Sequence, residues 1–273
     1  MLFDRRRITL KSRSQIEKMA VAGRLTAAAL DAVAEVIKPG MTPLQLNAIA
    51  DAVIRDGGGT PNFIGVPGHL EPFRHATCIS IDDEVVHGIP DDRVIGSGQI
   101  VSVDCGAEVD GWHGDSARTF LMGDVPEAAR RLSEVTREGM LAGVRASVPG
   151  ATLEDVAGAI EDVGLAAGYG IVRGYVGHGI GHEMHEEPQV TNYRTGRKGR
   201  KLEVGLCIAI EPMFTAGNFE TRVKPDGWTV ATADGSLAAH WEHTIAVTAD
   251  GPRILTLAAG EVAEGLTPAG ASA

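Results

Sequence analysis

Three short patterns occur twice along this chain of 273 residues, and they keep the same order in both copies. Each copy holds a Pro-Gly break followed by a threonine, then a His-Gly-Ile triplet, then a glycine six residues before an acid. The copies lie at residues 38–45 and 148–155, at 87–89 and 178–180, and at 98–104 and 205–211. One such match arises easily by chance, whereas three in one order indicate an internal duplication. We therefore expect two helix–helix–sheet halves around a shared central cleft.

The segments around the Pro-Gly breaks have the features of helix ends. Thr42 is followed by Gln45, and Thr152 by Asp155, which is the capping-box pattern at the start of a helix. Before the first break, apolar and small residues keep helical spacing at Ile16, Met19, Gly23, Ala27, Leu30, Ala34 and Ile37. The sequence thus predicts one helix before and one after each break.

Two acids stand at the ends of apolar runs that read as buried strands. Asp104 follows residues 100–103, and Glu211 follows residues 206–210. A carboxylate at the end of a buried strand is costly unless it is paired or coordinates a cation. Glycines flank His178, which lets a backbone or a metal approach closely. Together these segments predict a dinuclear metal site formed by Asp104, Asp115, His178, Glu211 and Glu242.

The relation between Asp104 and Asp115 follows from a predicted hairpin. Residues 101–106 alternate as a strand, and Asp110-Gly111 is a hairpin turn signal. A turn centred on those two residues places Asp104 opposite Ala117, with Asp115 as its diagonal neighbour. A four-residue loop, 108–111, would instead place Asp104 directly opposite Asp115. In either register both carboxylates share one face of the hairpin, about 5 to 8 Å apart.

The ligand types limit the choice of metal. Structural zinc prefers cysteine and histidine, and Ca²⁺ or Mg²⁺ seldom recruits an imidazole. One histidine with four carboxylates suits Mn²⁺, Fe²⁺, Co²⁺ or Zn²⁺ in a two-metal hydrolytic centre.

Composition restricts the partners and the compartment. The net charge of −11 argues against a nucleic-acid binder as a whole. Residues 194–201 hold five bases, which indicates either a solvated loop or contact with an acidic partner such as ribosomal RNA. No apolar run reaches the length of a membrane span, and the start lacks the apolar stretch of a signal peptide. Three cysteines, Cys78, Cys105 and Cys207, suit reduced, buried thiols, so we expect a cytoplasmic protein.

Several motifs together closely resemble the type I methionine aminopeptidases, which form subfamily A of peptidase family M24. The resemblance runs from about residue 10 to about residue 257. It rests on the segments Val85–Pro90, His113–Asp115, Gly177–Gly181, His185–Val190, Ile210–Met213, Asp226–Val230 and Glu242–Thr244. It implies an α+β pita-bread fold, with two pseudo-symmetric helix–sheet halves around a central antiparallel sheet. Residues 11–258 would form a single catalytic domain, 1–10 an N-terminal extension and 259–273 a flexible tail.

The resemblance also implies roles for these residues. Asp104 would chelate one ion, His178 and Glu211 the other, and Asp115 and Glu242 would bridge the two. The ions would be two divalent metals per chain, namely Co, Mn, Fe, Zn or Ni. His87 and His185 would contact the substrate, and Glu211 would also carry a proton towards the leaving amine. His69, His75, His113, His182, His240 and His243 are expected to be structural.

The implied reaction is removal of an N-terminal methionine from nascent chains whose second residue is small and uncharged, by a monomer. The methionine pocket departs from the family pattern, and we expect Phe63, Val66, Cys78, Met184 and Trp228 to line it. Relative to the family pattern, residues 68–75 look like an insertion. They form either a lid that brings Phe73 to the substrate or a solvated surface loop without a role.

Two alternatives are kept beside this interpretation. Another hydrolase of the same fold, such as a proline-specific aminopeptidase, would explain the metal ligands but not the segments around Trp228 and His185. A non-catalytic binding protein on the same fold should have lost one or more ligands, and here all five are present with both histidines.

Overall fold

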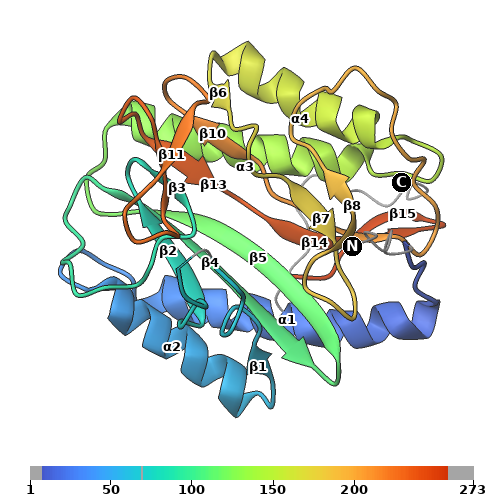
Figure 1. Cartoon of the computed structure of the whole chain (residues 1–273), viewed down its shortest axis with the longest axis horizontal. Coiled ribbons are helices and arrows are strands. Elements are labelled where there is room, and N and C mark those ends of the chain that lie inside the picture. The colour runs from blue at the N-terminus through green and yellow to red at the C-terminus, as the bar shows by residue number, and fades with distance from the viewer. Residues whose placement is uncertain (1–7, 69, 258–273) are drawn as a thin grey trace, which may run out of the picture.

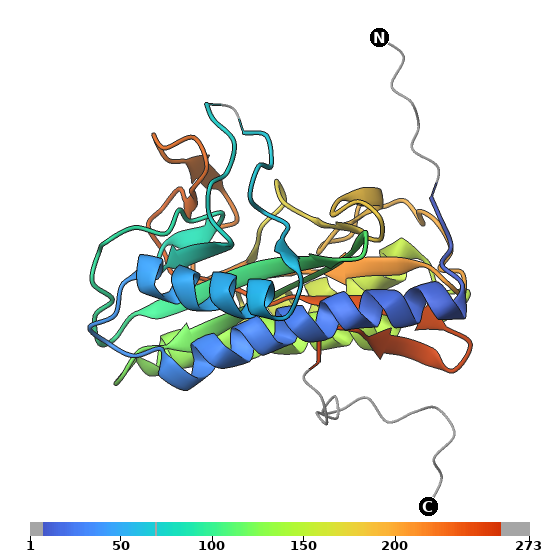
Figure 2. The same cartoon turned by 90° about the horizontal axis from the view of Figure 1, so that it is seen from below.

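The computed structural model describes residues 8–68 and 70–257 of the chain. In this part, two pairs of helices cover a layer of antiparallel strands, one pair on each side of the view in Figure 1. Figure 2 shows the helices against one face of the strands, while long loops rise from the opposite face. The α+β architecture with two similar halves is therefore confirmed. Residues 1–7 and 258–273, which include most of the predicted extension and the whole predicted tail, lie outside the described residues.

The helices lie before and after each Pro-Gly break, and the two that follow a break begin where the sequence predicts them. Their bounds are α1 (Arg13–Val36), α2 (Pro43–Asp56), α3 (Glu127–Ala146) and α4 (Leu153–Ala167). The capping box at Thr42 starts α2 and the one at Thr152 starts α4, with Thr152 Oγ1 accepting a hydrogen bond from the Asp155 N–H at 3.3 Å. A further capping box, between Ser12 and Gln15, starts α1. These side chains satisfy N–H groups that a helix start leaves without intrahelical partners.

Helix α1 packs across the strands of its own half. Ile16, Met19 and Leu30 lie on its buried face, as their spacing predicts. The same spacing predicts Ala34 on that face, but Ala34 is exposed and Val33 is buried in its place. Three residues after Leu30, the helical period keeps Val33 nearer the centre of the buried stripe, and the small alanine can face solvent at little cost.

A long hairpin of β4 (Ile100–Val109) and β5 (Trp112–Leu121) forms the centre of the first half. Asp104 pairs with Ala117, and Asp115 pairs with Gly106, so the two-residue turn is the correct alternative of the two registers. The turn residues Asp110 and Gly111 have φ of 51° and 76°, the left-handed values that a two-residue hairpin turn requires. Strand β4 also pairs with β2 (Thr77–Ile81) and β1 (Thr60–Pro61).

The second half is built around a five-stranded antiparallel sheet in the order β15–β14–β9–β7–β8. Its strands are β7 (Gly177–Gly179), β8 (Glu186–Val190), β9 (Cys207–Ile210), β14 (His243–Thr248) and β15 (Gly251–Ile254). Two three-stranded sheets complete the described fold. One contains β13 (Ala238–His240), β10 (Met213–Thr215) and β6 (Gly170–Ile171), and the other contains β11 (Thr221–Val223), β12 (Val230–Thr232) and β3 (Glu84–Val86).

The two halves meet where β5 runs beside the segment that joins β13 to β14. The Glu242 N–H donates a hydrogen bond to the Ala117 carbonyl at 3.0 Å, and Ser116 Oγ donates one to the Glu242 carbonyl at 2.7 Å. Thr244 Oγ1 donates to the Asp115 carbonyl at 2.8 Å and accepts from the Asp115 N–H at 3.0 Å. This seam brings an acid of the first half next to an acid of the second.

Two further expectations are met within the described residues. All three cysteines are buried and none forms a disulfide. None of the described helices is long and apolar enough to cross a membrane.

Candidate metal centre

The five predicted metal ligands come from both halves and meet in one cavity. Asp104 lies on β4 and Asp115 on β5, whereas His178 lies on β7, Glu211 directly after β9, and Glu242 between β13 and β14. All five line one cavity, together with both predicted substrate histidines, His87 and His185. Residues as far apart in the chain as 87 and 242 therefore share one site.

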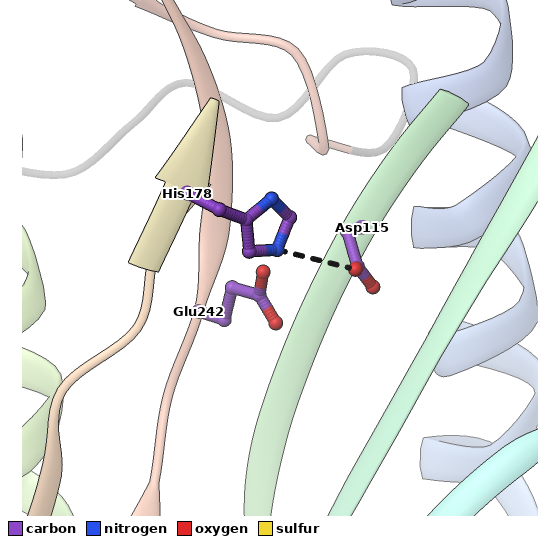
Figure 3. A group of neighbouring side chains, drawn as sticks. All are labelled: Asp115, His178 and Glu242. Carbon is purple, nitrogen blue, oxygen red and sulfur yellow. Dashed lines mark ion pairs between the residues drawn. The ribbon is translucent and has the colours of Figure 1, made fainter. Parts of the chain in front are cut away.

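The ligand atoms of Asp115, His178 and Glu242 lie within 4.8 Å of one another, and Figure 3 shows the three side chains pointing towards a common centre. His178 Nε2 lies 3.9 Å from Asp115 Oδ2 and 3.6 Å from Glu211 Oε1. Its Nδ1 lies 2.9 Å from the Gly179 carbonyl, which can only accept a hydrogen bond, so Nδ1 is the protonated nitrogen of the neutral ring. The bare Nε2 then faces the carboxylates, as a metal-ligating imidazole requires.

The carboxylates of the cavity are buried, and the described residues provide too few hydrogen-bond donors and positive charges to offset that burial. Burial raises the pKa of Asp104 to about 8, and burial with neighbouring carboxylates raises the pKa of Asp115, Glu211 and Glu242 well above the ordinary value. Among the described residues, Asp104 Oδ1, Asp115 Oδ1 and Glu242 Oε1 have no hydrogen-bond partner. Buried polar atoms without partners are rare, because each loses its hydration without replacement.

These observations fit divalent cations. A cation between the carboxylates would offset their mutual repulsion, and the unpartnered oxygens would coordinate it. Burial lowers the pKa of His178 to about 3, so the ring is neutral and able to coordinate. Carboxylate oxygens with one imidazole form a hard to borderline donor set, as several divalent first-row metals prefer.

The glycines around His178 serve the backbone. A Cβ on Gly177 would lie 2.3 Å from the Ala209 carbonyl oxygen of β9, and one on Gly179 would lie 2.2 Å from the Glu187 carbonyl oxygen of β8. Only glycine therefore lets β7 fit between its two neighbours. This close fit fixes the position of His178 between the strands.

The two predicted substrate histidines enter the cavity from different loops. The ring of His185 lies edge-on to that of His178, with centroids 4.4 Å apart. His87 has a left-handed backbone, with φ of 59°, and its ring is edge-on to Tyr175 at 5.5 Å. Burial lowers the pKa of His87 to about 4, and shielding from bulk water with the nearby His113 lowers the pKa of His185. Both rings are neutral near pH 7.

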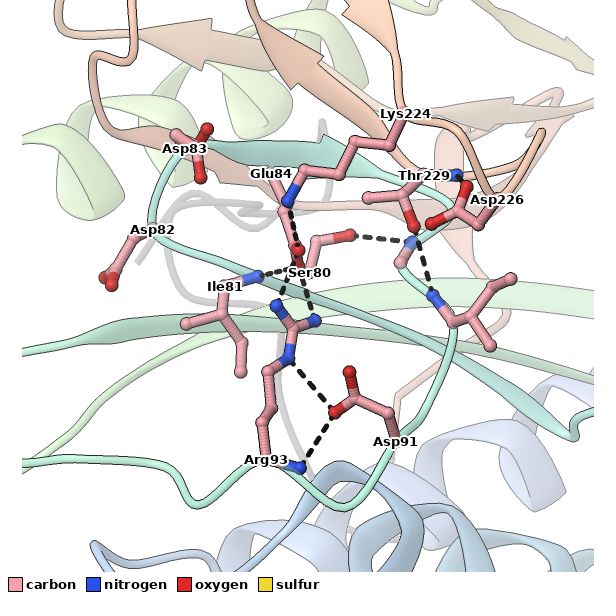
Figure 4. Close-up of polar contacts among 12 residues, drawn as sticks. Ser80, Ile81, Asp82, Asp83, Glu84, Asp91, Arg93, Lys224, Asp226 and Thr229 are labelled. Atoms are coloured by element: carbon pink, nitrogen blue, oxygen red, sulfur yellow. Dashed lines mark hydrogen bonds and ion pairs between the residues drawn. The ribbon is translucent and has the colours of Figure 1, made fainter.

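A network of charged side chains holds the loop of His87 to the loop of Trp228 (Figure 4). Glu84, on β3, is 2% exposed and accepts hydrogen bonds from Arg93 at 2.6 and 2.7 Å and from Lys224 at 2.7 Å. The N–H of Ile89, two residues after His87, donates to Thr229 Oγ1 at 3.4 Å. The backbone on both sides of the cavity is thus fixed by contacts outside it.

The predicted methionine-pocket residues also line this cavity. They are Phe63, Val66, Cys78, Met184 and Trp228, and the cavity includes Phe73 of the insertion as well. Phe73 is 3% exposed and packs edge-on against Trp228, with ring centroids 5.0 Å apart. Trp228 Nε1 donates a hydrogen bond to the Glu71 carbonyl at 3.1 Å. The insertion therefore supplies part of the wall, whereas its Leu70 is 71% exposed.

Four of the histidines expected to be structural, namely His75, His113, His182 and His243, have contacts that suit that role. His113 Nδ1 lies 3.1 Å from Asn62 Nδ2, and His243 Nδ1 lies 2.9 Å from Thr256 Oγ1. His182 stacks on Trp112 and its Nδ1 lies 2.7 Å from the Gly111 carbonyl. His75 lies edge-on to Phe73. His69 lies outside the described residues.

His240 is closer to the site than its sequence suggested. It is 2% exposed, its Nε2 lies 3.8 Å from Glu211 Oε2, and that nitrogen has no hydrogen-bond partner among the described residues. The signal was present in the sequence, because His240 precedes the predicted ligand Glu242 by only two residues.

Comparison with known proteins agrees with this geometry. The pattern of metallopeptidase family M24 matches residues 17–249. Methionine aminopeptidase 1 of Mycobacterium tuberculosis is 50% identical over 263 residues, covering 94% of this chain and 97% of the relative. The chain belongs to the methionine aminopeptidases of metallopeptidase family M24. Both the family and the enzyme class expected from the sequence are confirmed.

Solved structures of methionine aminopeptidases have the same fold. The enzyme from Rickettsia prowazekii is 39% identical with a TM-score of 0.88, covering 92% of this chain and 100% of that one. The enzyme from Thermotoga maritima is 41% identical with the same TM-score and coverage. A prolidase from Pyrococcus horikoshii, 23% identical with a TM-score of 0.73, shares the fold alone, covering 91% of this chain and 63% of that one. The pita-bread fold expected from the sequence is thus confirmed.

Proposed function

We propose that this methionine aminopeptidase removes the N-terminal methionine from newly made chains by metal-assisted hydrolysis of the first peptide bond. The observation that carries the proposal is the cavity itself. It joins a cluster of under-compensated buried carboxylates to two neutral histidines and an apolar wall. The named relatives, which cover nearly the whole chain, support the same reaction.

The proposal assigns the ion-binding role to five side chains. Asp104 would chelate one of two divalent ions, and His178 with Glu211 the other, while Asp115 and Glu242 would bridge them. Co, Mn, Fe, Zn and Ni all suit this donor set. Bound divalent ions polarise a carbonyl group and make water a stronger nucleophile near neutral pH.

The other residues act on the substrate and on its proton. His185, neutral near pH 7, would donate a hydrogen bond to the carbonyl oxygen as negative charge develops there. His87 would hold the amide beyond the scissile bond. Glu211, which stands beside the proposed ion-binding carboxylates, would take the proton of the attacking water and deliver it to the leaving amine.

The apolar wall selects the first residue. An unbranched side chain fills the space beside Phe63, Phe73 and Trp228, and a methionine thioether would also contact Met184 favourably. We expect methionine to react much faster than leucine or valine. A small, uncharged second residue completes the proposed substrate.

Release of methionine from Met-Ala and Met-Leu peptides tests the proposal directly. The purified protein would be stripped of metal and then supplied with each divalent ion in turn. We expect rapid release from Met-Ala, slow release from Met-Leu and none without metal. A protein that binds these ions but releases no methionine from either peptide would contradict the proposed function.

A pair of variants in the insertion tests the pocket assignment. Phe73→Ala removes part of the cavity wall, so we expect it to reduce the preference for methionine over leucine at the first position. Leu70→Ala is the matched control, because Leu70 belongs to the same loop but is 71% exposed. Equal preferences in the two variants and the unchanged protein would assign the insertion no role in selecting the first residue.

The cellular setting belongs to the same proposal. We expect the enzyme to act as a monomer in the cytoplasm, with weak contact between residues 194–201 and the ribosome. In that exposed loop Arg194 pairs with Glu161 and Asp162, and Arg200 pairs with Glu203. These ion pairs reduce the positive charge that the loop offers, so the contact should be weak and lost at moderate salt. Cosedimentation with ribosomes at increasing salt would measure it.

A further inference from the structure

A buried lysine lies close to the active-site cavity but outside it. The Lys11 side chain is only 4% exposed, and its Nζ lies 2.7 Å from Glu186 Oε2. Lysine is almost never buried to this extent unless it is paired, because its ammonium group loses hydration. Glu186 directly follows His185 in the chain. The ion pair therefore anchors the backbone next to a proposed catalytic residue.

Glu186 fixes the loop that carries His185. Its Oε1 accepts hydrogen bonds from the backbone N–H groups of His182 at 2.8 Å and Glu183 at 3.2 Å. Its Oε2 accepts from Lys11 Nζ at 2.7 Å and from Thr9 Oγ1 at 3.2 Å. One carboxylate thus ties the first turn of the loop to the segment before α1. Burial alone would raise the pKa of Glu186, but Lys11 outweighs that effect and lowers it.

The position of Lys11 leaves little freedom. A Cβ on Gly181 would lie 2.4 Å from Lys11 Cε, so the lysine stem occupies the space that a side chain would need. The Lys11 N–H donates a hydrogen bond to the Gly205 carbonyl at 2.7 Å, which fixes its backbone as well. Lys11 is therefore a rigid support, unlike the flexible lysines of a protein surface.

The supported loop contributes two residues to the cavity. Met184 forms part of the apolar wall, and the ring of His185 lies against that of His178. The carbonyl of Gly181, on the same loop, accepts a hydrogen bond at 2.9 Å from the N–H of His113, on the strand that carries Asp115. A small movement of this loop would displace His185 relative to the scissile carbonyl.

We propose that Lys11 is a positioning residue for the reaction, acting through Glu186 to hold His185 where it can donate its hydrogen bond. This inference rests on the proposed aminopeptidase function. Misplacing a catalytic group by about 1 Å can cost as much as about 100-fold in rate. Lys11→Met keeps the apolar stem and removes the charge, and we expect kcat to fall by about 10-fold.

A double-mutant cycle separates positioning from general destabilisation. We would measure kcat for Met-Ala release with the metal-loaded full chain, its Lys11→Met and His185→Ala variants, and the double variant. If Lys11 acts through His185, Lys11→Met should lower kcat about 10-fold alone but less than about 2-fold in the His185→Ala background. Equal factors in both backgrounds would overturn the proposal, as would an unchanged kcat in Lys11→Met.

Two further variants complete the test. Val33→Ala removes a fully buried side chain of α1 away from the cavity, so it should lower Tm without changing kcat. Glu186→Gln keeps an oxygen acceptor for the loop and removes the charge, and it replaces Lys11→Met in the cycle if that variant does not fold.

An unchanged protein that releases no methionine would refute the proposed function, whereas an active protein with an additive cycle would refute only the role of Lys11.

Discussion

Two groups of buried carboxylates in this chain have opposite surroundings. Asp104, Asp115, Glu211 and Glu242 face one another in the cavity. Among the described residues, Asp115 and Glu211 have only neutral histidines as ion-pair partners. The histidine Nε2 atoms lie 3.6 to 3.9 Å from the carboxylate oxygens. Burial holds the pKa of these carboxyl groups far above the ordinary value. This region is therefore rich in negative charge and poor in compensation.

Glu84 and Glu186 show the other arrangement. Glu84 is 2% exposed, yet Arg93 and Lys224 both donate to it, and Lys11 with two backbone N–H groups donates to Glu186. Burial works to raise the pKa of each group, and the basic partners outweigh it. These two carboxylates are compensated within the chain.

The difference distinguishes a ligand site from a structural support. A buried carboxylate with basic partners stabilises one arrangement of loops and needs nothing from outside. A cluster of buried carboxylates without such partners is unfavourable as it stands, so it indicates that a cation from solution completes it. Both kinds lie near the cavity, and the compensated ones support the loops that carry His87 and His185.

The largest expected effect is loss of the ion-binding charge. Asp104→Asn and Glu242→Gln should each abolish nearly all turnover, because a neutral amide cannot balance or bridge two cations. Metal content after gel filtration, measured beside kcat for Met-Ala release, checks this result. Full activity with an unchanged metal content in either variant would show that the uncompensated carboxylates are not ligands.

A histidine of the same cavity should behave differently from these acids. His185→Ala should keep both ions but lower kcat by about 100-fold, because it removes a hydrogen bond made as charge develops on oxygen. The measurements are metal content, kcat and KM. A change confined to KM would make His185 a substrate-binding residue without a role in the chemical step.

In the metal-free protein, the two groups of carboxylates should change stability with pH in opposite directions, and the cavity carboxylates should lower it as pH rises. A group whose pKa is raised in the folded state adds stability below its unfolded pKa and loses that stability as pH rises through its folded pKa. For Asp104 these limits are about 3.9 when unfolded and about 8 when folded.

Between about pH 7.5 and pH 8, histidines are almost entirely neutral in both states, so their contribution to the change is small. We therefore expect Tm of the chelator-treated protein to fall over this interval. Restoring a divalent ion should remove the fall, because the ion holds the carboxylates in their charged form. A metal-free Tm that stays constant or rises over the interval would mean that these carboxylates are ionised without any cation.

Much of the site could be predicted because its signals are local. Asp104 and Glu211 end apolar runs, Asp110-Gly111 fixes the hairpin register, and the glycines around His178 require close backbone contact. Each of these follows from strand alternation or turn chemistry over a few residues. The proposed ligand set therefore followed from segments that could be interpreted one at a time.

The supports of the site could not be predicted in this way. Lys11 meets Glu186 across 175 positions, and Lys224 meets Glu84 across 140. Nothing in the neighbourhood of either residue in the sequence indicates a buried partner, because long-range pairing depends on how the halves pack. The same reason explains why the sequence left open whether residues 68–75 bring Phe73 to the substrate or form a loop without a role, whereas the structure places Phe73 in the cavity wall against Trp228.

The smallest effect on activity is expected from the compensated group. Glu84→Gln leaves Arg93 and Lys224 facing a neutral amide, so the variant should lose about 2 to 3 kcal/mol of stability, since Arg93 is partly exposed. Because the pKa of Glu84 is lowered in the folded state, its contribution is present above about pH 4.5 and is lost as pH falls below that value. The Tm difference between the unchanged protein and Glu84→Gln should therefore be large at about pH 7 and shrink towards about pH 4. Metal content should stay unchanged, in contrast to Asp104→Asn. If Glu84→Gln instead released the bound ions, the separation between compensated supports and uncompensated ligands would not hold.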